Sequence, residues 1–112
     1  MRRLPPLALA LAVLAAAPSG AQAARSCKPV VDPYPGTRYA GVDLTRIRAT
    51  GVSCATARRV ARRAHHKALG LTPPVCGIRR FTWHGWQVTG NLRADSDRYS
   101  ATRPGKRVSW RF

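Results

Sequence analysis

The segment from Cys54 to Leu69 constrains the fold more than any other part of the chain, because it carries a complete set of helix signals. Ser53 precedes it and can accept a hydrogen bond from the first-turn amides, as an N-cap does. Gly70 follows it and suits the left-handed position after a helix, while Pro73 and Pro74 prevent continuation. We therefore predict a helix over residues 54–69.

The predicted helix has two distinct faces when its residues are projected on a helical wheel. The apolar face is narrow and mostly alanine: Cys54, Ala57, Val60, Ala61, Ala64 and Ala68. The opposite face is basic: Arg58, Arg59, Arg62, Arg63, His66 and Lys67. Small side chains let a helix lie close to its partner, and no second segment has comparable helix signals. We therefore expect the alanine face to pack on a sheet.

The rest of the domain favours strands. Residues 44–50 alternate, with Thr45, Ile47 and Ala49 on one side. Further strands are expected at 78–83, 86–88, 98–102 and 107–112, separated by His84-Gly85, a bend at Gly90-Asn91, a polar loop at 94–97 and a turn at 103–106. Pro104 followed by Gly105 is typical of a type II turn. The prediction is an α+β fold, with one helix packed on a small antiparallel sheet as a two-layer sandwich.

The first 23 residues are typical of a secretory signal peptide. Arg2 and Arg3 precede an uncharged apolar run at 7–17, and Ala21-Gln22-Ala23 matches the small-residue pattern of a cleavage site. The run is too short for a membrane span of about 20 residues. We expect cleavage after Ala23, no transmembrane segment afterwards, and a secreted, extracellular protein. It would have an extended Pro/Gly-rich arm at 24–43 and one α+β domain at 44–112.

Three cysteines in a short exported chain indicate one disulfide and one leftover thiol. We favour Cys27–Cys54, which ties the arm to the start of the predicted helix, and the alternative pair is Cys54–Cys76. In the chain-entropy model the favoured loop contributes about 3 kcal/mol to the free energy of unfolding. We expect the leftover Cys76 to be buried and inert, with a link between two chains as the alternative.

The ionisable residues form no recognisable catalytic or metal-binding pattern. No Cys-x-x-Cys occurs, and the three histidines stand at no known metal-ligand spacing, so no metal or cofactor is predicted. Only Cys76 and His84 offer a nucleophile and a base near each other in the sequence. Asp95 and Asp97 lie in a polar stretch, where aspartates usually accept local amide hydrogen bonds. We therefore predict that the protein is not an enzyme.

The charge points to a polyanion as the partner. Lys and Arg number 20 against 4 acidic residues, all aspartate, and the net charge of +16 becomes +14 after cleavage. Such a charge attracts an anionic polymer, a nucleic acid or a membrane surface through salt-sensitive forces. We predict a polyanion-binding surface that joins strand arginines such as Arg107 and Arg111 to the basic helix face. Its helix residues are Arg58, Arg59, Arg62, Arg63 and Lys67. The base composition of a GC-rich genome is the alternative source of the arginine excess.

The stretch Trp83-His84-Gly85-Trp86 is a second candidate surface. Phe81 and Trp83 would share one strand face, so we expect them in the core. The break at Gly85 makes Trp86 the candidate exposed aromatic residue. The main hypothesis is thus a non-enzymatic exported binding domain. The alternative is a small inhibitor or antagonist of an extracellular protein, which would bind that protein through residues 83–86.

The sequence from Ile47 to Ala61 reads I-x-A-x-G-V-S-C-x-x-A-R-x-V-A. This motif resembles small secreted proteins of high-GC Gram-positive (actinobacterial) bacteria, which also end in a strand like Val108–Phe112. The resemblance covers residues 44–112 and implies export and the fold of the domain. Many of those proteins carry a cysteine pair where this chain has Val88 and Ala101, so it implies no second disulfide here. We carry over no activity or site residue from these functionally uncharacterised proteins.

Overall fold

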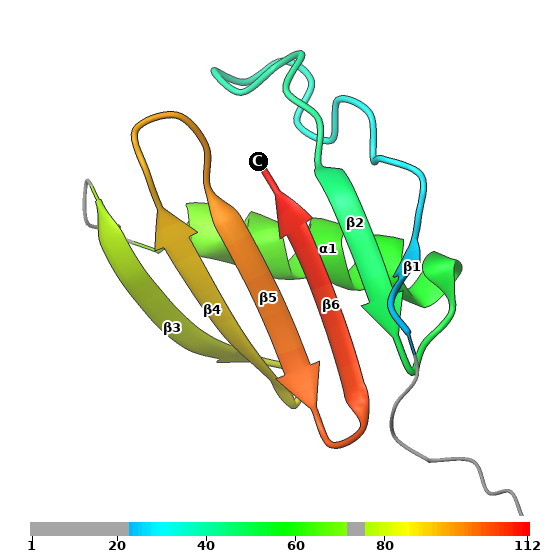
Figure 1. Cartoon of the computed structure of the whole chain (residues 1–112). Coiled ribbons are helices and arrows are strands. Elements are labelled where there is room, and N and C mark those ends of the chain that lie inside the picture. The colour runs from blue at the N-terminus through cyan, green and yellow to red at the C-terminus, as the bar shows by residue number, and fades with distance from the viewer. Residues whose placement is uncertain (1–22, 72–75) are drawn as a thin grey trace, which may run out of the picture.

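The computed structural model describes residues 23–71 and 76–112, so most of the predicted signal peptide and both Pro73 and Pro74 lie outside the described residues. The elements are β1 Arg25–Ser26, β2 Thr45–Thr50, α1 Cys54–Leu69, β3 Gly77–Trp83, β4 Trp86–Leu92, β5 Arg98–Arg103 and β6 Lys106–Arg111. The strands form one antiparallel sheet in the order β1-β2-β6-β5-β4-β3. Figure 1 shows α1 crossing behind this sheet, and no described element covers the other face. The predicted α+β two-layer fold is therefore confirmed.

α1 begins and ends at the predicted residues. The Thr56 amide donates a hydrogen bond to the Ser53 hydroxyl at 3.1 Å, so Ser53 is the N-cap. The predicted left-handed conformation of Gly70 is wrong. Its φ is −84°, because its N–H bonds to the Lys67 carbonyl at 3.0 Å and the last turn tightens in the right-handed region. The buried side of α1 differs from the predicted apolar face at two residues, because Cys54 is only half-buried and His65 is added. Its buried residues are Ala57, Val60, Ala61, Ala64, His65 and Ala68.

Two tight hairpins build the larger part of the sheet. His84 and Gly85 join β3 to β4 with φ values of 45° and 82°, the two positive values of a type I′ turn. Gly105 has φ 74°, as the predicted type II turn requires. The predicted bend at Gly90 is wrong, because β4 continues to Leu92. A Cβ atom on Gly90 would lie 2.5 Å from the Tyr99 ring, so this glycine makes room for a core side chain.

The core lies between the sheet and the alanine stripe of α1. The Tyr99 and Trp110 rings stack in parallel at 5.5 Å and fill the space that the small helix side chains leave. In β2, Ile47 and Ala49 are buried as predicted, but Thr45 is exposed. The β2–β6 register shifts between Thr45 and Arg48, and this irregularity breaks the alternation that would have buried Thr45.

The arm is pinned beside β2. The favoured disulfide Cys27–Cys54 is present, with a Cα–Cα distance of 5.4 Å, so the alternative Cys54–Cys76 is excluded. Farther along, Val30 and Leu44 exchange backbone hydrogen bonds of 3.0 and 2.9 Å. Cys76 is free and exposed, so the prediction of a buried thiol is wrong. It precedes β3, the edge strand of the sheet, and therefore lies outside the core.

Candidate anion-binding site

The five predicted polyanion-binding residues of α1 are not equivalent. Arg59, Arg62 and Arg63 are exposed and make no hydrogen bond to another described residue. Arg58 instead binds the arm, donating to the Lys28 carbonyl at 3.2 Å and the Pro29 carbonyl at 3.1 Å. Lys67 bridges to the sheet, where its Nζ donates to the Thr82 carbonyl at 3.0 Å. Arg58 therefore supports the fold, and Lys67 combines a structural contact with a free charge.

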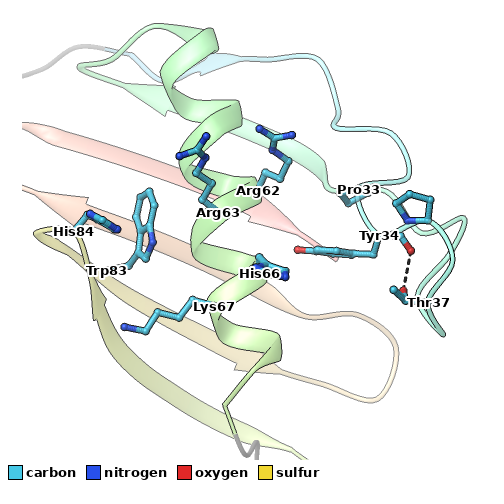
Figure 2. Close-up of a pocket in the computed structure, with 10 residues that line it drawn as sticks. Pro33, Tyr34, Thr37, Arg62, Arg63, His66, Lys67, Trp83 and His84 are labelled. Atoms are coloured by element: carbon cyan, nitrogen blue, oxygen red, sulfur yellow. Dashed lines mark hydrogen bonds between the residues drawn. The ribbon is translucent and has the colours of Figure 1, made fainter.

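An open cleft of about 870 Å³ lies along the basic face of α1, and we call it the helix cleft. Figure 2 shows the α1 side chains between the Trp83-His84 pair and the turn of the arm that carries Tyr34. The lining residues come from three separate parts of the chain: Pro33, Tyr34, Pro35, Thr37, Arg62, Arg63, His66, Lys67, Trp83 and His84. None of these residues is acidic.

Local structure places the aromatic side of the helix cleft. The type I′ turn holds His84 at a positive φ, and the Trp83 and His84 rings meet edge to face at 4.6 Å. The Lys67 bond to Thr82 draws the end of β3 toward the helix. Trp83 is partly exposed, so one part of its ring packs on the core while another part borders the cleft.

The arm side of the helix cleft is held by a buried hydrogen bond. The Tyr34 hydroxyl and His65 Nδ1 lie 2.6 Å apart, and the Thr37 hydroxyl donates to the Tyr34 carbonyl at 2.8 Å. The Tyr34 ring also lies nearly parallel to the His66 ring, at 6.1 Å. Burial raises the pKa of the Tyr34 hydroxyl, so it stays protonated and available for this bond. The arm therefore has a fixed position against the helix.

His65, which the sequence pattern did not single out, holds Tyr34 and the arm side of the helix cleft in place. It is 0% exposed and packs against the rings of Phe112 at 4.2 Å and Tyr99 at 5.1 Å. Burial, with a smaller contribution from the charge of His66, lowers the pKa of His65 to about 3. The sequence does carry a signal for this burial. His65 follows Ala61 by four residues and precedes Ala68 by three, so it lies on the same face of the helix as these two alanines. Its neutral ring thus sits where the pattern expects a core residue.

Trp86, the candidate exposed aromatic residue, is instead buried, with 4% of its surface exposed. A two-residue turn places Trp83 and Trp86 opposite each other on the helix side of the sheet. β4 lies inside the sheet, so neighbouring side chains cover Trp86. β3 lies at the edge of the sheet, so Trp83 remains partly exposed to solvent. The Arg103 guanidinium also lies over the Trp86 ring, 5.2 Å from its centroid. The partly exposed aromatic residue of this hairpin is therefore Trp83.

The predicted surface that joins helix and strand arginines does not form. In β6, Val108 and Trp110 are buried against α1, and alternation turns Arg107 and Arg111 to the opposite face of the sheet. Arg62 and Arg63 lie on the helix side, so the sheet separates the two groups. The described residues therefore carry basic side chains on both sides of the sheet, where one joined surface was expected.

The residues considered for catalysis do not converge. Cys76 precedes β3 and His84 follows it, so the length of the strand, about 20 Å, separates the thiol from the imidazole. Asp97 Oδ1 accepts a local hydrogen bond from the Arg93 amide at 3.3 Å, and burial raises the pKa of Asp97. Among the described residues no group of three or more His, Cys, Asp and Glu side chains could hold a metal ion. In the same part of the chain, no helix combines the length and apolar character that a membrane crossing needs.

No known protein family, curated protein or solved structure matches this chain. What the protein binds must therefore be inferred from its own side chains. The helix cleft is a concave site whose lining is basic and aromatic, and such sites are where ligands are expected to bind.

Proposed function

We propose that the protein is an exported, non-enzymatic binding domain that holds a phosphate-bearing polymer in the helix cleft. One observation carries the proposal: Arg62, Arg63 and Lys67 lie beside Trp83 in an open cleft whose described lining residues include no carboxylate. Export is supported by the signal-like leader and by the Cys27–Cys54 disulfide, which suits an oxidising compartment.

The cleft offers two kinds of contact to such a polymer. The guanidinium groups of Arg62 and Arg63 can each bind a phosphate through two parallel hydrogen bonds. Lys67 uses one donor on Thr82 and has two N–H groups left. Trp83 presents an apolar ring, and stacking of a base on such a ring contributes about 1–3 kcal/mol. A single strand of nucleic acid combines phosphates and rings, so it is the probe that fits this cleft.

The test is the binding of a fluorescent oligodeoxythymidine strand to the folded protein, measured by fluorescence anisotropy over a range of salt concentrations. The Arg62→Gln/Arg63→Gln variant should bind at least about tenfold more weakly, and the slope of log K against log salt should fall by about 1.4 for two lost contacts. Trp83→Ala should weaken binding with little change in this slope, because stacking releases no counterions.

The matched control is Arg25→Gln/Arg93→Gln, which removes the same charge from exposed residues that line neither this cleft nor the other basic surface. Equal losses in the two double variants would reject the cleft and favour arginine excess as a general property of the chain. Retention of an extracellular protein that survives high salt but fails in Trp83→Ala would favour the alternative, an inhibitor or antagonist. Trp86→Ala would not test that alternative, since Trp86 lies in the core.

A further inference from the structure

The open face of the sheet carries its own concentration of arginine, separate from the helix cleft. A hollow of about 400 Å³ lies on this face, and we call it the sheet hollow. Five arginines from three adjacent strands surround it: Arg46, Arg48, Arg98, Arg107 and Arg111. Figure 1 views this face, with β2, β6 and β5 side by side in front of α1. No described residue forms an ion pair or hydrogen bond with any of these five guanidinium groups.

The strand register explains the hollow. Ser109 of β6 pairs with Ser100 of β5, and Ser100 pairs with Thr89 of β4. These three short side chains form a row of hydroxyl groups across neighbouring strands, spaced at about 4.8 Å. The longer side chains of Arg98 and Arg111 rise on one side of the row. The row is therefore the floor of a trough with basic walls.

The sheet holds Arg98 and Arg111 side by side, although their like charges repel each other. Arg98 pairs directly with Arg111 across β5 and β6, and like charges at such positions destabilise a sheet. The charge of Arg98 lowers the pKa of Arg111, with smaller contributions from burial and from Arg46, while Asp95 opposes them. An anion placed between these guanidinium groups would turn the repulsion into attraction.

The side chains of the sheet hollow select among anionic partners. Tyr99 and Trp110 also border the hollow, but only 4% and 1% of their surfaces are exposed because their rings pack toward α1. Among the described lining residues, the hollow therefore offers no ring on which a base can stack. Hydroxyl and guanidinium groups together match the tetrahedral oxygens of a phosphate ester. A second copy of this chain would bring arginine against arginine, so charge excludes it as the occupant.

We propose that the sheet hollow is a second binding site, which takes the phosphate groups of a linear polymer without aromatic bases. The polymer lies across the strands, along the row Ser109-Ser100-Thr89, with Arg98 and Arg111 on its phosphates. The proposal does not depend on the helix cleft, because the two sites share no lining residue and lie on opposite sides of the sheet. A protein with both sites can join two anionic chains.

The probe is long-chain inorganic polyphosphate, and its binding to the full folded protein is measured by calorimetry at several salt concentrations. The Arg98→Gln/Arg111→Gln variant should lose at least about tenfold in affinity and about 2 units of salt slope, one for each phosphate contact. Arg25→Gln/Arg93→Gln removes the same charge from exposed residues outside both sites and should lose much less. Equal losses in these two variants would overturn the proposal, because net charge alone would then explain binding.

A second pair of variants tests the position without changing any charge. Ser100→Leu places a large side chain on the floor of the hollow and should abolish most polyphosphate binding. Thr82→Leu is the matched control, since Thr82 is an exposed strand residue outside the hollow. Polyphosphate binding that survives Ser100→Leu in a protein with an unchanged melting temperature would overturn the proposal. If Ser100→Leu does not fold, Arg48→Gln/Arg107→Gln replaces it as the local test.

The oligodeoxythymidine strand separates this proposal from the proposed function. It should respond to Arg62→Gln/Arg63→Gln and Trp83→Ala, whereas polyphosphate should respond to Arg98→Gln/Arg111→Gln. If oligodeoxythymidine binding is unchanged in Arg62→Gln/Arg63→Gln and in Trp83→Ala, the helix cleft is rejected and the polyphosphate result still stands. If Arg98→Gln/Arg111→Gln weakens oligodeoxythymidine binding as much as polyphosphate binding, the selectivity of the sheet hollow is contradicted.

Discussion

The helix cleft and the sheet hollow are both rich in basic residues, but they are built in different ways. The walls of the cleft come from three distant segments, and their positions depend on side-chain contacts such as Tyr34–His65 and Lys67–Thr82. The floor of the hollow comes from adjacent strands, and the backbone hydrogen bonds of the sheet position it. A site of the first kind depends on the docking of the arm, whereas a site of the second kind persists as long as the sheet does.

This difference separates the two sites experimentally. Conditions that loosen the arm should damage the helix cleft before the sheet hollow. Conditions that change charge alone should act on both sites, because Arg62 and Arg63 of the cleft and the arginines of the hollow make no hydrogen bond to another described residue.

Loss of the disulfide should have the largest effect of all the changes considered. It should weaken binding at the helix cleft more than binding at the sheet hollow. Cys27→Ser/Cys54→Ser frees the arm at its start, and we expect a loss of about 3 kcal/mol in the free energy of unfolding, measured with urea. Under conditions where the variant is still folded, oligodeoxythymidine binding should fall more than polyphosphate binding. Cys76→Ser is the control and should change neither, since Cys76 is free and exposed. An equal loss of affinity for oligodeoxythymidine and for polyphosphate would contradict the independence of the two sites.

Acid should weaken the protein through His65. Its pKa in the folded state, about 3, lies below the ordinary value of 6.5, so the unfolded state binds the additional proton between these values. Stability is therefore present above pH 6.5 and is lost as the pH falls through this window. From pH 7 to pH 5 the free energy of unfolding should fall by about 2 kcal/mol from this group.

The measurement is urea unfolding at several pH values, with His65→Gln as the test variant. This variant should be less stable at pH 7 but should lose the part of the pH dependence that comes from His65. His66→Gln is the control, because His66 is exposed and lies next to His65 in the sequence. Wild-type and His65→Gln curves with the same slope between pH 5 and pH 7 would show that His65 is not the titrating group.

Local patterns predicted the elements well and the sites only in part. The cap at Ser53 and the alanine stripe are properties of one segment, so the bounds of the helix and most of its buried face were confirmed. Gly90 was misread as a bend because its role depends on the Tyr99 ring, which comes from another strand. Trp86 was expected to be exposed because the order of the strands, which buries β4 and leaves β3 at the edge, has no local signal.

The sheet hollow is the clearest case of a feature that local sequence patterns cannot predict. Alternation alone placed Arg107 and Arg111 on one side of their strand, opposite Val108. It did not reveal that β6 lies between β2 and β5, which brings Arg46 and Arg98 to the same hollow. Neighbouring strands are chosen by the packing of the whole domain, so a charged cluster of this kind appears only with the topology.

Removal of one arginine from the sheet hollow should give the smallest effect, with a direction that separates the two sites. Arg98→Gln removes the charge directly opposite Arg111, so the melting temperature should rise slightly at low salt, and the rise should shrink as salt screens the repulsion. Arg58→Gln should act in the opposite direction, because Arg58 holds the arm through the Lys28 and Pro29 carbonyls. If Arg98→Gln lowers the melting temperature instead, Arg98 supports the fold as Arg58 does, and the hollow is not a preformed site whose charges await an anion.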